Sequence, residues 1–179
     1  MTRRSSALSL ERIRRAYGLL LDAIVVVLMV AIAIEVTIGV VYRAIGQSLS
    51  WYDEVAVILL AWLTFYGSAL AALKRAHIGF PGIANSLAPP LRLPVVVAGK
   101  VIVIGFIGLV GWIGYSILDI LATDFLISLP SISVAWAQSV IPISCAMFVF
   151  AELLNLPDTL RAACGLGSAS ASDLAEHLH

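Results

Sequence analysis

Four long apolar stretches, separated by short polar segments, dominate the sequence. They run from about residue 19 to 42, 52 to 73, 93 to 118 and 134 to 156. Each is long enough to cross a hydrocarbon core of about 30 Å as a helix, which takes about 20 apolar residues. The strands of a membrane barrel are shorter and alternate in polarity, so these continuous runs favour helices. The pattern predicts an all-α membrane protein with four transmembrane helices in one domain, residues 19–160.

The segments outside these spans are short. Because the connections 43–51, 74–92 and 119–133 leave little slack, we expect sequential helices to pack as antiparallel neighbours. Residues 161–179 are small and polar towards their end, and we expect a disordered tail there.

The distribution of Lys and Arg predicts the orientation. Nine of them fall before the first span, between the second and third, or after the fourth: Arg3, Arg4, Arg12, Arg14, Arg15, Lys74, Arg75, Arg92 and Arg161. Arg43 falls on the other side, and Lys100 lies near the start of the third span, from which its side chain could snorkel back. Cytoplasmic loops are enriched in Lys and Arg, so both termini are expected in the cytoplasm.

Residues 1–18 form a basic segment with a weak helical pattern. Leu10, Ile13 and Tyr17 recur at three- and four-residue spacing. One interpretation is a short amphipathic helix lying on the inner leaflet with its arginines near anionic lipid. The other is a basic flank that fixes topology. The sequence does not choose between them.

Composition supports the membrane class and argues against several kinds of site. The chain is 61% hydrophobic and 12% charged, whereas soluble domains are about one quarter charged. Cys145 lies in an apolar run and Cys164 in the polar tail, so neither a disulfide framework nor a metal site is expected. We find no phosphate-binding loop and no metal or haem motif. The sequence therefore predicts no enzyme, no catalytic residue, no cofactor and no nucleic acid partner.

The second span carries opposite charges at its two ends. Ser50 and Asp53 fit the capping-box pattern that begins a helix. Asp53 and Glu54 would lie at the positive end of the helix dipole, and Lys74, Arg75 and His77 at the negative end. Trp51 would anchor the first of these ends at the membrane interface. Helix electrostatics thus accounts for much of this pattern without any chemistry.

Glu35 is the deepest ionisable group that we single out. A charge at the bilayer centre costs roughly 2.5–3.5 kcal/mol on insertion scales, so Glu35 should face protein, water or a cation. It either binds a proton or partner group, or makes a structural hydrogen bond to another helix. Arg43 is about 12 Å further along the same helix, so pairing would require both side chains to stretch. Asp22 is close enough to the cytoplasmic headgroups to anchor the helix there.

Small residues and prolines mark where helices can approach or bend. Gly67 with Ala71 and Ser68 with Ala72 are small-xxx-small pairs. A spiralling strip of small residues follows the third span at Gly105, Gly108, Gly111 and Gly114. Such strips let another helix come close, either within the bundle or from a partner. Pro142 should kink the fourth span because it lacks a backbone N–H.

Several of these residues together resemble the small membrane subunit of tripartite ATP-independent periplasmic (TRAP) transporters, the DctQ-like or Q subunit. The matching elements are Trp51 with Asp53–Glu54, Trp62-Leu63 followed by Gly67, Lys74 to Ile78, Leu129-Pro130 and Ile141-Pro142. The resemblance covers about residues 11–160. Where the family often has a second Glu this chain has Asp53, and where it often has an acid after the His-Ile pair this chain has Gly79-Phe80-Pro81.

The resemblance implies a scaffold in the bacterial inner membrane rather than a pore. In that family a large membrane subunit (the M subunit) carries the sodium and substrate sites. A periplasmic solute-binding protein (the P subunit) delivers an organic acid. On this view Trp51 and Glu54 lie at the periplasmic face, and Lys74, Arg75 and His77 lie near lipid phosphates or the large subunit. Glu35 and the glycine strip are candidates for the subunit interface.

Two other classes stay open. A small self-associating transporter could use Glu35 as a proton-coupled site. An assembly subunit of another membrane complex would share the scaffold properties and differ only in its partner.

Overall fold

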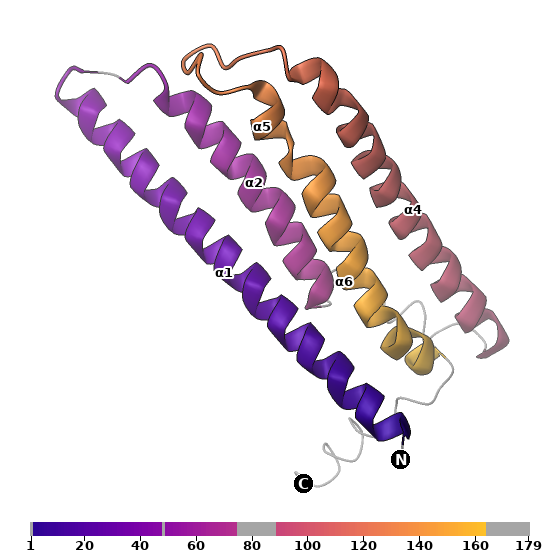
Figure 1. Cartoon of the computed structure of the whole chain (residues 1–179). Coiled ribbons are helices and arrows are strands. Elements are labelled where there is room, and N and C mark those ends of the chain that lie inside the picture. The colour runs from indigo at the N-terminus through magenta and orange to yellow at the C-terminus, as the bar shows by residue number, and fades with distance from the viewer. Residues whose placement is uncertain (1, 48, 75–88, 164–179) are drawn as a thin grey trace, which may run out of the picture.

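The computed structural model describes residues 2–47, 49–74 and 89–163, and these are almost entirely helical (Figure 1). The helices are α1 (Thr2–Ala44), α2 (Tyr52–Leu73), α4 (Pro89–Leu121), α5 (Val134–Gln138) and α6 (Val140–Ala163). Four segments are long and apolar enough to cross a membrane: Glu11–Ala44, Tyr52–Leu73, Leu93–Leu121 and Val134–Arg161. The predicted all-α, four-span fold is confirmed.

The long helices lie side by side in a row. Its order is α1, α2, α6 and α4, with α5 continuing the line of α6 (Figure 1). The first and second spans (α1 and α2) and the third and fourth (α4 and α6) are neighbours as expected. The expected pairing of the second with the third is wrong, because α6 lies between α2 and α4. Contacts between helix faces, and not the order along the chain, decide which helices are neighbours.

Helix α1 is continuous from Thr2 to Ala44. At 1.5 Å per residue its 43 residues extend about 65 Å, roughly twice the thickness of a hydrocarbon core. The basic N-terminal segment is thus helical and continues directly into the first span, without a break that would make it a separate helix.

The fourth span is interrupted where Pro142 predicts a kink. Helix α5 ends at Gln138 and α6 starts at Val140, with Ser139 as a turn between them. Pro142 has no N–H to donate to the carbonyl of Gln138 four residues earlier, so the ladder is weakest at this point. Ser133 begins α5 by accepting a hydrogen bond on its Oγ from the Ala135 N–H.

The buried core is small and is shared by three helices. Its buried members are Leu21 on α1, Ala69, Ala72 and Leu73 on α2, and Phe148, Ala151 and Leu154 on α6. The span Leu93–Leu121 buries none of its most apolar 18-residue window. A single row of helices leaves both broad faces of the molecule apolar and uncovered, as suits a protein surrounded by lipid or by another membrane protein.

The glycines of the predicted strip divide into two groups. A Cβ at Gly111 would lie 2.9 Å from the Cβ of Cys145, and one at Gly114 would lie 2.7 Å from Ile141 Cγ2, so these two let α4 approach α6. A Cβ at Gly105 or Gly108 would meet nothing within 4 Å. The prediction that small residues allow close helix approach therefore applies inside this chain to Gly111 and Gly114, while Gly105 and Gly108 face open space.

Candidate functional site: polar contacts along the helix row

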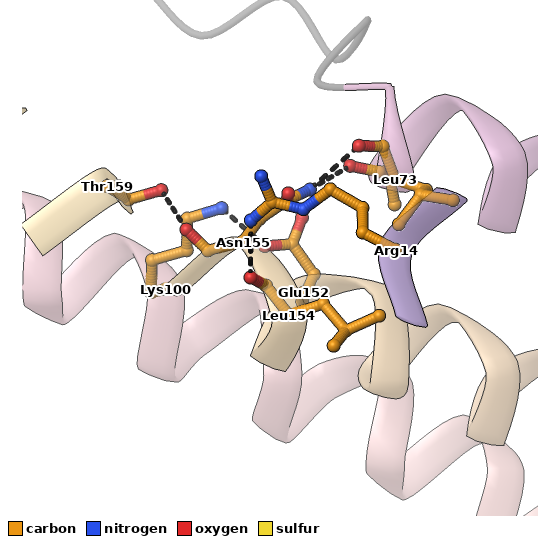
Figure 2. Close-up of polar contacts among 8 residues, drawn as sticks. Arg14, Leu73, Lys100, Glu152, Leu154, Asn155 and Thr159 are labelled. Carbon is orange, nitrogen blue, oxygen red and sulfur yellow. Dashed lines mark hydrogen bonds and ion pairs between the residues drawn. The ribbon is translucent and has the colours of Figure 1, made fainter. Parts of the chain in front are cut away.

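Three polar side chains of α6 form the centre of the largest group of polar contacts. Glu152, Asn155 and Asp158, together with Arg14 from α1 and Lys100 from α4, are called the α6 polar cluster below. Figure 2 shows Arg14, Lys100, Glu152 and Asn155 converging from three helices. The cluster connects α6 to each of the other long helices.

Asn155 holds the C-terminal end of α2. It is 2% exposed, and its Nδ2 donates to the carbonyls of Ala72 (2.9 Å) and Leu73 (3.0 Å) (Figure 2). The last carbonyls of a helix have no partner within their own helix and are costly to leave bare away from water. One buried amide therefore satisfies two of them and fixes α6 against α2.

Lys100 forms an ion pair with Glu152, whose side chain is 5% exposed, while that of Lys100 is 26% exposed. The expectation that Lys100 snorkels to the membrane surface is wrong, because α6 presents a carboxylate to it inside the row. A carboxylate buried this deeply needs a compensating charge, and Lys100 supplies it.

Arg14 makes the third connection. Its guanidinium contacts the Asp158 carboxylate at 2.8 Å and donates to the carbonyl of Leu154 at 2.7 Å. One turn further along α1, the Tyr17 hydroxyl donates to the carbonyl of Met147 at 2.7 Å. The basic segment before the first span is therefore fastened to α6.

Lys74 pairs with Asp22 at 2.6 Å, and both side chains are about half exposed. This contact joins α1 to the end of α2, so Asp22, expected to anchor at headgroups, has a protein partner. Arg75 and His77, predicted to act beside Lys74, lie outside the described residues.

At the opposite end of the row, Glu54 holds the loop between α4 and α5. Its carboxylate accepts hydrogen bonds from the backbone N–H groups of Ile127 (3.1 Å) and Ser128 (2.8 Å). Ser128 Oγ in turn donates to the Ser50 carbonyl. Glu54 thus connects segments more than 70 residues apart.

The predicted capping box is wrong. Trp51, not Ser50, is the N-cap residue of α2, and its side chain makes no capping hydrogen bond. Ser50 uses its carbonyl to bind Ser128, and the Glu54 side chain turns to the loop. Asp53 is exposed and makes no hydrogen bond within the described residues.

Trp62 meets the interruption of the fourth span. Its Nε1–H donates to the Ala137 carbonyl at 2.9 Å, and its ring centroid lies 4.8 Å from that of Trp136. Trp62 therefore joins α2 to the last turn of α5, beside the interruption at Ser139. A Cβ at Gly67, further along α2, would meet nothing within 4 Å.

Glu35 faces α2 without a partner. Both of its carboxylate oxygens are shielded from solvent and receive no hydrogen bond from the described part of the chain. Arg43 does not pair with it but lies 5.9 Å above the ring of Tyr52.

Sequence reasoning missed Glu152, Asn155 and Asp158, which lie at the end of the expected fourth span. A signal was present, since Lys100 and Glu152 are opposite charges within two expected spans. Among residues 2–47, 49–74 and 89–163 there is no group of three His, Cys, Asp or Glu side chains that could hold a metal ion. Most of the polar side chains named above bind other parts of this chain, so the arrangement joins helices.

The comparisons with known proteins agree with these features. Residues 32–162 match the family of tripartite ATP-independent periplasmic transporters, DctQ component. The chain is also similar to the sialic acid TRAP transporter small permease protein SiaQ of Vibrio cholerae serotype O1. The two are 26% identical over 165 residues, which cover 91% of this chain and 94% of that protein. This chain belongs to the DctQ family, the small membrane subunits of TRAP transporters.

Proposed function

We propose that this chain is the scaffold subunit of a sodium-coupled TRAP transporter that takes up an organic acid. Membership of the DctQ family supports the role of a small permease subunit. The relative in Vibrio cholerae is named for sialic acid, itself an organic acid. The large membrane subunit would carry the sodium and substrate sites, and a periplasmic solute-binding protein would deliver the substrate.

The observation that supports a scaffold most is that the buried or central polar side chains bind other parts of this chain. Asn155, Glu152 and Glu54 bind a helix end, a lysine and a loop of this same chain. These contacts join the helices to one another near both of the helices' ends and make the row more rigid. A transport path would instead need polar groups turned towards a cavity that a solute can enter. The grooves on α1 and between α1 and α2 are open and lined mainly by apolar side chains.

The uncovered faces of the row supply the surface on which a large subunit could pack. Gly105 and Gly108 on α4, and Gly67 on α2, meet no side chain of this chain at the Cβ position. Helix association in lipid depends on close packing of small residues, since lipid tails are as apolar as leucine. Two of these three glycines lie on α4, so we propose that the large subunit packs against that helix.

The orientation in the inner membrane is part of the proposal. The start of α1 and the end of α6 lie at the same end of the row (Figure 1). The excess of Lys and Arg at that end supports a cytoplasmic location for both termini. Trp51, Asp53 and Glu54 would then lie at the periplasmic face, where the solute-binding protein docks. Lys74, Arg75 and His77 would lie near cytoplasmic lipid phosphates.

Co-purification tests the proposal. The chain would be tagged in its native host, the membranes solubilised gently, and the bound proteins identified by mass. Stoichiometric recovery of a much larger multi-span protein supports the scaffold role. Recovery of a self-associated species alone contradicts it and favours the transporter that would use Glu35.

A further inference from the structure

Glu35 differs from Glu152, the buried acid of the α6 polar cluster. Glu152 is compensated by Lys100. The two carboxylate oxygens of Glu35 are buried and receive no hydrogen bond from any described residue. An ionised carboxylate with no donor is strongly disfavoured in an apolar setting, and such groups become neutral instead. The contact between α1 and α2 therefore contains an acid without a compensating partner.

The groups that face Glu35 do not supply a positive charge. Helix α2 packs against α1, with the Tyr52 ring against Gly39 one turn from Glu35, and Asp53 follows Tyr52 on α2. The negative charge of the Asp53 carboxylate acts on Glu35 and disfavours a second negative charge there. On α1 itself Arg43 is two turns away and is held over the Tyr52 ring, which lies between the two helices.

The carboxylate oxygens of Glu35 are shielded from solvent by the chain itself. One turn further along α1, Gly39 lets the Tyr52 ring press against the helix, since a Cβ there would lie 2.1 Å from ring carbons. This tight contact closes the interface beside Glu35.

We propose that Glu35 is held as a neutral carboxylic acid, so that the α1–α2 interface binds one proton. The proton neutralises the Glu35 carboxylate, whose charge the interface cannot compensate. It also removes the repulsion between Glu35 and Asp53. Ionising Glu35 would put two negative charges beside the Gly39–Tyr52 contact and loosen this end of α1 from α2. The bound proton has a structural role, which we call the proton lock, and it is not transported. This inference therefore does not depend on the scaffold proposal.

Infrared difference spectroscopy tests the protonation directly. The full-length chain, in whatever membrane complex it purifies with, is reconstituted in lipid at neutral pH. The wild type is compared with Glu35→Gln and with Glu11→Gln, a matched control at an exposed glutamate of the same helix. We expect a carbonyl band of a protonated carboxylic acid that Glu35→Gln removes and Glu11→Gln retains. Absence of the band in the wild type, or its persistence in Glu35→Gln, overturns the proposal.

A second measurement uses the same proteins. The wild-type melting temperature should fall as the pH rises from the ordinary titration range of a glutamate to the range in which the band disappears, and should level off above it. Glu35→Gln mimics the neutral acid and should not show this fall, while Asp53→Asn, which removes the neighbouring like charge, should make the band disappear at lower pH. Equal pH profiles for wild type and Glu35→Gln would overturn the proposed lock, whatever partner the chain binds.

Discussion

Lys100 on α4 forms an ion pair with Glu152 on α6, and the Glu152 carboxylate is buried within the helix row. The pair joins the outermost helix α4 to the helix at the centre of the polar contacts. Its energetic importance lies in what is left behind when one partner is removed, since an uncompensated charge would remain in an apolar environment.

Replacing Lys100 with Met should therefore destabilise the subunit clearly. Removing one partner of a fully buried pair costs about 3–5 kcal/mol, and the partial exposure of Lys100 reduces this to about 2–3 kcal/mol. The double variant Lys100→Met, Glu152→Leu should regain most of the loss. Denaturant unfolding in mixed micelles measures both. A double variant no more stable than Lys100→Met would show that the pair is not the cause.

The exposed pair of Asp22 and Lys74 provides the contrast. Both side chains are about half exposed, so Asp22→Asn should cost no more than about 0.5 kcal/mol, as is usual for surface ion pairs. The same unfolding assay measures it. A loss as large as that of Lys100→Met would mean that this end of α2 depends on the contact far more than its exposure indicates.

Glu54→Gln should loosen the loop between α4 and α5. The substitution removes a charge that accepts two backbone N–H groups, and each hydrogen bond to a charged group contributes about 1.5–3 kcal/mol. We expect faster hydrogen exchange at Ile127 and Ser128, read by mass spectrometry.

Asp53→Asn is the matched control, since Asp53 is exposed and makes no hydrogen bond in the described residues. Equal exchange in both variants would argue that the loop does not depend on Glu54.

The two groups of glycines on α4 predict opposite defects. Gly111→Leu should destabilise the subunit by about 1–3 kcal/mol, the usual range for overpacking, because Cys145 Cβ is fixed by its backbone. Gly108→Leu should leave the isolated subunit unchanged but reduce the yield of its complex with the large subunit. Thermal stability and co-purification yield separate the two. Normal complex yield in Gly108→Leu would move the interface away from this strip.

Hydropathy predicted the four long helices because a membrane span is a local property of about 20 residues. Pro142 likewise predicted a local interruption, which the structure places at Ser139. The order of helices in the row could not be predicted, since nothing local indicates that α6 lies between α2 and α4. The same holds for Lys100 and Glu152, which are 52 residues apart in sequence.

The error at Ser50 has the same origin. Its spacing to Asp53 fits a capping signal, but the helix begins one residue later than that signal requires, with Trp51 as its N-cap. Ser50 lies outside the helix, where its carbonyl accepts a hydrogen bond from Ser128. A pattern confined to four residues could not reveal this tertiary contact.

Uptake into proteoliposomes tests the central claim most directly. Vesicles would contain this chain, the large subunit, or both. The solute-binding protein and a radiolabelled organic acid would be added outside, and a sodium gradient directed into the vesicles would be imposed. The scaffold account predicts uptake when both membrane proteins and the binding protein are present, and none with this chain alone. Uptake by this chain alone, with or without the sodium gradient, would contradict it.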